Sequence, residues 1–133
     1  MNAASFLRAM LLALVLTPAF AGTALVAASD YAFEIVEPEV KQGDAAIITV
    51  RLVALRTRES VTDAVIFATR LDMAPDDMAA MTVKVEALPS VEPGLYRFKA
   101  NLMMEGGWRF SLAAKVQGEA ETVRGELILR AIP

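Results

Sequence analysis

The 133-residue sequence contains no cysteine and no histidine. Without cysteine the fold has no disulfide bond and no thiol nucleophile, and without histidine it lacks the side chain most often used as a general base. A glycine-rich phosphate loop is also missing, and Ser60, Ser90 and Ser111 have no activating neighbour in the sequence. We therefore predict that the protein is not an enzyme.

Positive charge is scarce as well. The chain has 13 Lys and Arg residues against 16 Asp and Glu residues, which gives a formal net charge of −3. The cationic residues are scattered along the sequence, whereas a nucleic-acid-binding domain needs a basic stripe or patch. We therefore expect no nucleic acid partner.

Charged residues are almost absent from residues 1–28, where Arg8 is the only one. The apolar run Ala9–Phe20 follows Arg8, and Pro18 interrupts this run near its end. The tripeptide Ala19-Phe20-Ala21 has the small residues of a cleavage site. Together these features predict a secretory signal peptide.

The sequence leaves the end of this segment open. A second cleavage site follows Ala28, and we expect one domain over residues 29–133, a length typical of a single domain. The alternative is an uncleaved membrane anchor, because Ala9–Ala28 is an uncharged run of 20 residues, about the length that spans a bilayer. In both cases the rest of the chain is exported, and a bacterial periplasm is the expected location.

Apolar and polar residues alternate through much of the exported part, as they do in strands with one buried face. The clearest case is a β-hairpin over residues 95–116 that reverses at Glu105-Gly106-Gly107. Its buried set is predicted to be Tyr96, Phe98, Ala100, Leu102, Met104, Trp108, Phe110, Leu112, Ala114 and Val116. We expect Trp108 to dominate so small a core.

Five more strands are expected, separated by prolines and turn residues, over residues 31–37, 46–53, 61–71, 82–87 and 122–130. The 61–71 strand is apolar on both faces, which predicts that both faces are covered. Seven short strands without a long amphipathic helix indicate an all-β fold. We predict a seven-stranded antiparallel immunoglobulin-like β-sandwich after the N-terminal signal peptide.

Methionine is the only soft metal ligand in the sequence. The candidate ligands lie in the 72–81 segment and at the tip of the hairpin, and they are Met73, Met78, Met81 and Met103. Thioethers favour Cu(I) over zinc and over hard cations such as calcium and magnesium. If Pro75 begins a short helical turn, Met78 and Met81 fall at i and i+3 on one face.

Two alternatives to a metal site remain open in this region. Methionine is a flexible side chain that often fills gaps in a core, and the alternation assigns Met104 to packing beside Trp108. The acids Asp72, Asp76 and Asp77 lack the register of a calcium-binding loop, so we interpret them as solvated acids at the start of a helical turn.

Three short motifs carry a resemblance to a known family. Pro93-Gly94-Leu95-Tyr96 begins the hairpin, Met104-x-Gly106-x-Trp108 forms its turn, and Asp63-Ala64-Val65 begins an earlier strand. Over roughly residues 43–116 the chain resembles the YtkA-like/FixH-like family of exported immunoglobulin-like domains. Members of this family often accompany copper export, copper resistance or the assembly of copper-containing oxidases. The resemblance therefore implies an accessory role, and the lack of histidine means that any imidazole site of a relative is absent here.

Three functional hypotheses follow. In the first, the protein is a periplasmic accessory protein in copper handling or export that holds Cu(I) on the four candidate methionines. In the second, it is a metal-free interaction module that docks on a membrane transporter or oxidase. In the third, it is a purely structural extracytoplasmic domain.

Overall fold

The computed structural model describes residues 30–133, so the predicted signal peptide or anchor lies outside the described residues. The strands are β1 (Tyr31–Ile35), β2 (Glu39–Lys41), β3 (Gly43–Ala54), β4 (Glu59–Ser60), β5 (Val65–Met73), β6 (Met78–Val83), β7 (Val85–Leu88), β8 (Leu95–Leu102), β9 (Gly106–Lys115) and β10 (Val123–Ile132). A single 3-10 turn, η2 (Ala74–Asp76), connects β5 to β6. No helix in this part of the chain is long and apolar enough to cross a membrane.

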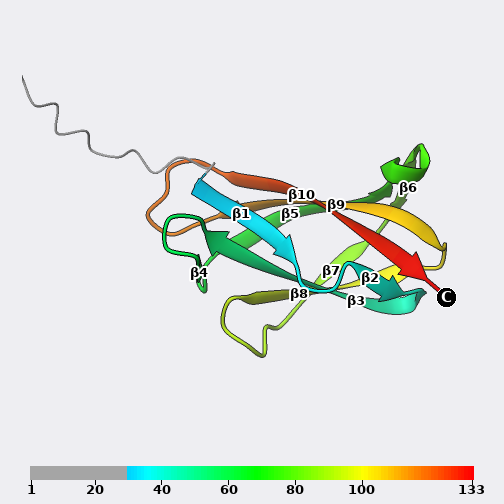
Figure 1. The fold of residues 1–133 in the computed structure, drawn as a ribbon, viewed down its shortest axis with the longest axis horizontal. Helices are drawn as coiled ribbons and strands as arrows, with labels where there is room; N and C mark the ends of the chain where they lie inside the picture. Colours follow the sequence, from blue (N-terminus) through cyan, green and yellow to red (C-terminus); the bar gives the residue numbers. More distant parts are fainter. Residues whose placement is uncertain (1–29) are drawn as a thin grey trace, which may run out of the picture.

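The strands form two sheets that pack face to face as a β-sandwich (Figure 1). One sheet has the order β1-β3-β8-β7, with β4 paired to β3, and the other has the order β2-β10-β9-β5-β6. Neighbouring strands are antiparallel, except that β2 and β10 are parallel. The prediction of an all-β immunoglobulin-like sandwich is confirmed.

The predicted number of seven strands is wrong, because the described chain has ten. Strands β2 and β4 are only three and two residues long, too short to show a period in sequence, and both lie in segments predicted as turns. The strand predicted over residues 82–87 is divided between β6 and β7, which belong to different sheets. Lys84 lies between these two strands, where the chain crosses from one sheet to the other.

The core lies between the two sheets and follows the predicted alternation closely. Phe98 of β8 and Phe110 of β9 meet across it edge to face, with ring centroids 5.2 Å apart. The largest fully buried apolar side chains are Trp108, Phe110, Ile48, Leu52, Leu71, Met73, Leu102, Leu129, Val50 and Val123. On the second strand of the predicted hairpin every member of the predicted buried set is buried.

Two predictions about burial are wrong. Met104 is partly exposed, because β8 ends at Leu102 and the chain leaves the sheet before Met104. The predicted cover on both faces of the 61–71 strand is also missing, since Val65 and Phe67 of β5 are more than half exposed. The pairing of β5 with β9 shifts between Ile66 and Ala68, and this bulge takes Phe67 out of the regular alternation.

Candidate metal site at the methionine end

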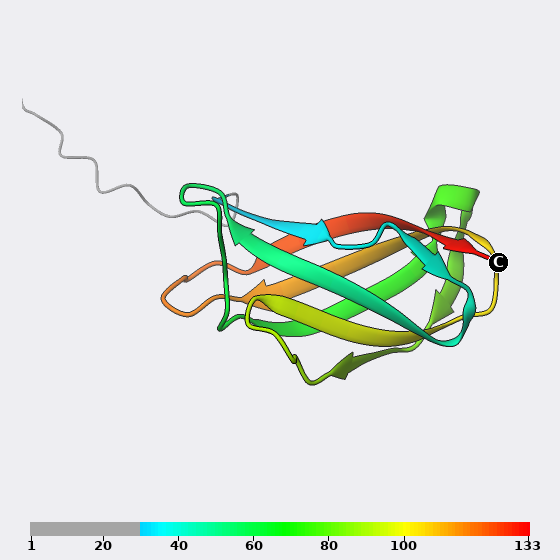
Figure 2. The same cartoon turned by 60° about the horizontal axis from the view of Figure 1, so that its bottom comes forward.

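One end of the sandwich carries all the candidate ligands. We call it the methionine end, and it is formed by Met73 at the end of β5, η2, strand β6 and the β8–β9 loop (residues 103–105). Figures 1 and 2 both place η2 and this loop at the end of the molecule opposite the start of β1. The methionine end therefore combines segments that are about 30 residues apart in the sequence.

The tip of the hairpin lies directly against η2. Gly106 has a positive φ of 132°, and a Cβ atom there would collide with the carboxylate of Asp76 and lie 3.3 Å from the methyl group of Met73. The backbone N–H of Gly107 donates a hydrogen bond of 3.0 Å to Oδ2 of Asp76. Glycine is needed at 106 because both the backbone angle and the close approach of η2 exclude a side chain.

The indole of Trp108 holds the other side of the β8–β9 loop. Trp108 is fully buried, and its Nε1–H donates a hydrogen bond of 3.1 Å to the carbonyl oxygen of Met104. This bond satisfies the only polar atom of the largest core side chain. It also positions the backbone that carries Met103 and Met104, while their side chains remain exposed.

A buried carboxylate anchors the start of η2. Asp72 is completely buried, and its Oδ1 accepts a hydrogen bond of 2.9 Å from the backbone N–H of Ala74. Its Oδ2 accepts hydrogen bonds from Nε of Arg70 at 3.0 Å and from Nη2 of Arg109 at 2.9 Å. Arg70 also donates through Nη2 to the carbonyl oxygen of Ala79, at 2.9 Å. The carboxylate therefore connects β5 to β9 and η2, and Arg70 extends the network to β6.

These partners keep Asp72 ionised. Burial alone raises the pKa of this carboxyl, but the hydrogen bonds from Arg109, the Ala74 amide and Arg70 outweigh the burial and lower its pKa below the ordinary value. The same pairing raises the pKa of Arg109. The interpretation as a solvated helix-start acid is wrong for Asp72, which is fully buried. Asp76 is an exposed acid in the first turn of η2, as interpreted, and it also accepts a hydrogen bond from the hairpin.

The structural role of Asp72 was missed in the sequence, although a signal was present. Residues at i and i+2 of a strand lie on the same face, so a strand extended to Met73 would have placed Arg70 beside Asp72. The third partner, Arg109, is 37 residues away along the chain and can be identified only from the strand pairing.

The candidate ligands differ in their access to solvent. Met73 is fully buried, whereas Met78, Met81 and Met103 have exposed fractions of 37%, 41% and 63%. Met73 is paired with Met78 in the register of β5 and β6, so the two lie next to each other across the sheet. Met104, which the sequence reasoning assigned to the core, is 38% exposed beside Met103.

The predicted helical arrangement of Met78 and Met81 is wrong. Asp77 has a left-handed backbone with φ of 58°, which ends η2 after one turn, and both methionines belong to the extended strand β6. The pairing of β6 with β5 passes from Thr82 directly to Met78, so the three residues between them bulge out of the ladder. Pairing with β5 therefore replaces the helical continuation that Pro75 suggested.

The donor set suits a soft monovalent cation. Exposed thioethers on β6 and on the β8–β9 loop offer neutral sulfur ligands, and Asp77 and Glu105 add negative charge next to them in the sequence. Among residues 30–133, no three His, Cys, Asp or Glu side chains come together in a group that could hold a metal ion. Thioether sulfur is the ligand type at this end that favours Cu(I) over hard cations.

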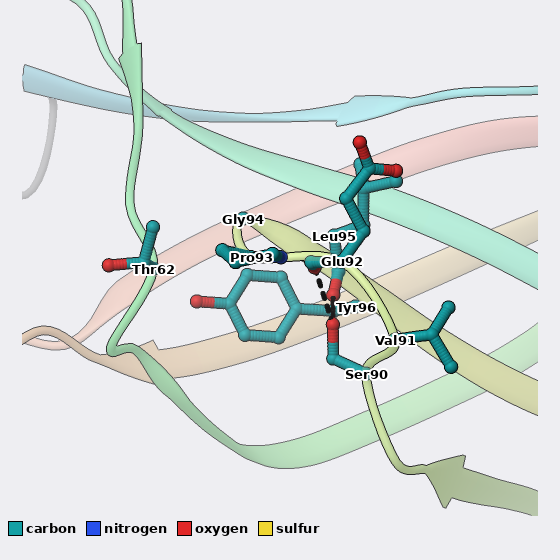
Figure 3. A pocket seen from close by; sticks show the side chains of 8 residues that line it. All are labelled: Thr62, Ser90, Val91, Glu92, Pro93, Gly94, Leu95 and Tyr96. Atoms are coloured by element: carbon teal, nitrogen blue, oxygen red, sulfur yellow. Dashed lines mark hydrogen bonds between the residues drawn. The ribbon is translucent and has the colours of Figure 1, made fainter.

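A hollow of about 340 Å³ lies near the opposite end of β8, and Figure 3 shows the side chains of Tyr96, Ser90, Thr62 and Glu92 among its polar groups. The Tyr96 hydroxyl donates to the carbonyl oxygen of Val61 at 2.7 Å and accepts from the N–H of Ala64 at 3.1 Å. The Ser90 hydroxyl lies within hydrogen-bond distance of two backbone carbonyls. Because internal contacts occupy both hydroxyls, we interpret this hollow as a structural corner that joins β8 to the 61–64 segment.

Comparison with known proteins gives a family and several structural neighbours. No curated protein matches the chain. The crystal structure of the Lin-41 filamin domain is 18% identical with a TM-score of 0.45, and the match covers 75% of this chain and 91% of that one. A conjugative transposon lipoprotein from Bacteroides eggerthii is 14% identical with a TM-score of 0.33, and the match covers 75% of this chain and 96% of that one. The YtkA-like family model matches residues 26–113, and the chain therefore belongs to the YtkA-like family.

Proposed function

We propose that the protein is an exported, periplasmic accessory protein in copper handling or export that holds Cu(I) at the methionine end. The observation that carries this proposal is the exposure of four methionines, Met78, Met81, Met103 and Met104, on β6 and the β8–β9 loop at the same end of the sandwich. Large apolar side chains are normally buried, so this concentration calls for an explanation. We explain these exposed methionines as ligands, because their thioether sulfur atoms can coordinate a soft cation.

Membership in the YtkA-like family supports export. The predicted signal peptide agrees with export, although it lies outside the described residues. Met73 has no exposed surface, so in this proposal it lies beneath the site and supports Met78. The exposed methionines supply the ligands that an incoming ion meets.

The second candidate function is metal-free docking of the same end on a membrane transporter or oxidase. The observation that favours it is the same set of exposed methionines, because flexible methionine side chains also form adaptable apolar binding surfaces. The two functions require different properties of the exposed methionines. Copper binding needs the sulfur atom, whereas docking needs only a flexible apolar side chain.

Methionine-to-leucine variants separate these functions, because leucine keeps the apolar volume and removes the thioether. We would titrate the purified domain with Cu(I) in competition with a chelator under anaerobic conditions. The triple variant Met78→Leu, Met81→Leu and Met103→Leu should lose most of its Cu(I) affinity. The matched control is Met73→Leu, which alters a methionine without exposed surface. Equal affinity of the wild type and the triple variant would refute the copper proposal.

Methyl-labelled methionine supplies a second readout that does not depend on the chelator. Ag(I), a soft monovalent cation without redox chemistry of its own under these conditions, can replace Cu(I) as a probe. The methyl resonances of Met78, Met81 and Met103 should shift on addition of Ag(I), and the resonance of Met73 should shift less. If a membrane partner co-purifies equally well with the wild type and the triple leucine variant, while no methyl group responds to Ag(I), docking replaces copper binding as the function.

A further inference from the structure

The outer face of the β2-β10-β9-β5-β6 sheet carries a group of arginines in a protein that is acidic overall. Arg70, Arg109, Arg124 and Arg130 alternate with inward-facing neighbours on β5, β9 and β10, and together they define what we call the arginine face. In the strand register Arg70 lies opposite Ser111, while Arg124 lies opposite Ala113, two residues further along β9. The cations therefore lie on three adjacent strands.

A shallow hollow of about 170 Å³ lies between two of these arginines. Arg70 and Arg124 border it, and Ala68, Ser111 and Ala113 supply its small side chains. Because the alanines end at Cβ, they leave space above the sheet that a longer side chain would fill. The hollow is thus large enough for the end of one inserted side chain and too small for a drug-sized ligand.

The hollow has polar groups that the described part of the chain does not use. The side chains of Arg124 and Ser111 have no hydrogen bond or ion pair with any residue in the 30–133 region. Arg70 is held by Asp72 and by the carbonyl oxygen of Ala79, and its side chain is still 55% exposed. On the same face, Nε of Arg109 is buried without a hydrogen-bond partner. A guanidinium that is already fixed loses little conformational entropy when it binds a ligand.

The chemistry of these groups favours a carboxylate. A guanidinium matches a carboxylate with two parallel hydrogen bonds, and a serine hydroxyl can donate a third. Val65, Phe67 and Ile128 are exposed apolar side chains on β5 and β10, two of the strands that carry these arginines, which suits a protein segment better than a free ion. The net negative charge of the chain also disfavours an extended polyanionic surface such as an anionic membrane.

We propose that the arginine face binds an acidic segment of a partner protein, with one carboxylate side chain inserted between Arg70 and Arg124. Glu126 lies opposite Ser111 on β10 and weakens the positive potential of the hollow. Arg70 also donates a hydrogen bond to β6 at the methionine end, but the hollow is lined by no methionine, so the proposal does not depend on copper binding.

The test uses a short fluorescent peptide that alternates glutamate with serine and valine, and a matched peptide with glutamine in place of glutamate. Binding to the domain is measured by fluorescence anisotropy at low and high salt. We expect Arg124→Ala to weaken binding about ten-fold, the loss of roughly one charge-assisted hydrogen-bonded pair. Glu126→Gln should strengthen binding about two- to three-fold, since it removes the competing negative charge.

The control is Arg97→Ala, which removes an arginine from the outer face of the other sheet and should leave the affinity unchanged. The triple leucine variant of the methionine end should also bind the peptide normally, which keeps this test independent of the copper test. Equal binding of the glutamate and glutamine peptides, or equal affinity of the wild type and Arg124→Ala, would overturn the proposal. Arg124-dependent binding to phosphatidylglycerol vesicles without peptide binding would also overturn it, because the ligand would then be a lipid.

Discussion

The substitution Asp72→Asn tests whether the buried carboxylate holds the methionine end together. Asparagine has nearly the same size and keeps one carbonyl oxygen, so the bond from the Ala74 amide can persist. In place of Oδ2, asparagine carries an amide NH₂ group, which faces the N–H donors of Arg70 and Arg109. Two charge-assisted hydrogen bonds are lost, and donors oppose donors in a site without solvent access.

The magnitude follows from the number and exposure of these bonds. A hydrogen bond to a charged group contributes about 1.5 to 3 kcal/mol, so two bonds set an upper range of about 3 to 6 kcal/mol. The side chains of Arg70 and Arg109 are 55% and 31% exposed. Water can therefore form hydrogen bonds with these arginines in place of some of those lost to Asp72, which reduces the cost. We therefore expect Asp72→Asn to lower the free energy of unfolding by about 2 to 4 kcal/mol. For a domain of this size the melting temperature should fall by about 10 to 25 °C.

Urea unfolding of the wild type and the variant, followed by tryptophan fluorescence, measures this difference directly. The matched control is Glu86→Gln, the same carboxylate-to-amide change at the ion pair between Glu86 and Lys99, where both side chains are about half exposed. This control should change the free energy of unfolding by less than about 1 kcal/mol. Equal unfolding midpoints for Asp72→Asn and Glu86→Gln would refute the reasoning.

The pH dependence supplies an independent check on Asp72. Its pKa is lowered in the folded protein, so the unfolded state binds more protons in the range between the two pKa values. The stabilisation is therefore complete above about pH 4 and is lost as the pH falls through the lowered pKa. The difference in unfolding free energy between the wild type and Asp72→Asn should narrow below pH 4. A constant difference from pH 7 to pH 3 would contradict this assignment.

Three further predictions concern the motif residues. Gly94 and Gly118 have nearly equal positive φ angles of 86° and 87°, but only at Gly94 would a Cβ meet another side chain closely, so Gly94→Ala should cost about 1 to 3 kcal/mol more than Gly118→Ala in urea unfolding. Tyr96→Phe leaves two backbone groups without their partner, and it should cost about 1 to 3 kcal/mol and speed amide hydrogen exchange at Ala64; unchanged exchange there would contradict the proposed corner. Trp108→Ala should cost about 3 to 5 kcal/mol in thermal unfolding, and a loss below 1 kcal/mol would contradict its central place in the core.

The parts of the fold that could be predicted are those in which a strand is long and buried on one face. The alternation from Trp108 to Val116 and from Ile48 to Leu52 specifies which side chains face the core, and all of these inward positions are buried. This works because a period of two is imposed by the backbone itself. The fold class follows from the number of such segments and from the turn residues between them.

The methionine end could not be predicted in the same way, because contacts between distant segments determine its conformation. Pro75 and the acids after it are typical of a helix start, but pairing of β6 with β5 extends the chain at Met78. Met104 continues the alternation in sequence, yet β8 ends at Leu102, so Met104 lies in the β8–β9 loop and outside the core. Local sequence patterns predict neither the extended conformation at Met78 nor the exposure of Met104, because both depend on where η2 packs against the hairpin.

The residues that carry the family resemblance have structural roles, and this limits what the resemblance implies about function. Gly106 admits η2 against the hairpin, Trp108 fills the core, and the Tyr96 hydroxyl joins two segments. A chain with these residues can therefore adopt the YtkA-like fold whether or not it binds copper. The copper proposal rests instead on exposed thioethers such as Met78 and Met103, which the fold does not require. Replacing these two with leucine should leave the unfolding free energy within about 0.5 kcal/mol of the wild type while Cu(I) binding weakens, because surface substitutions rarely change stability by more.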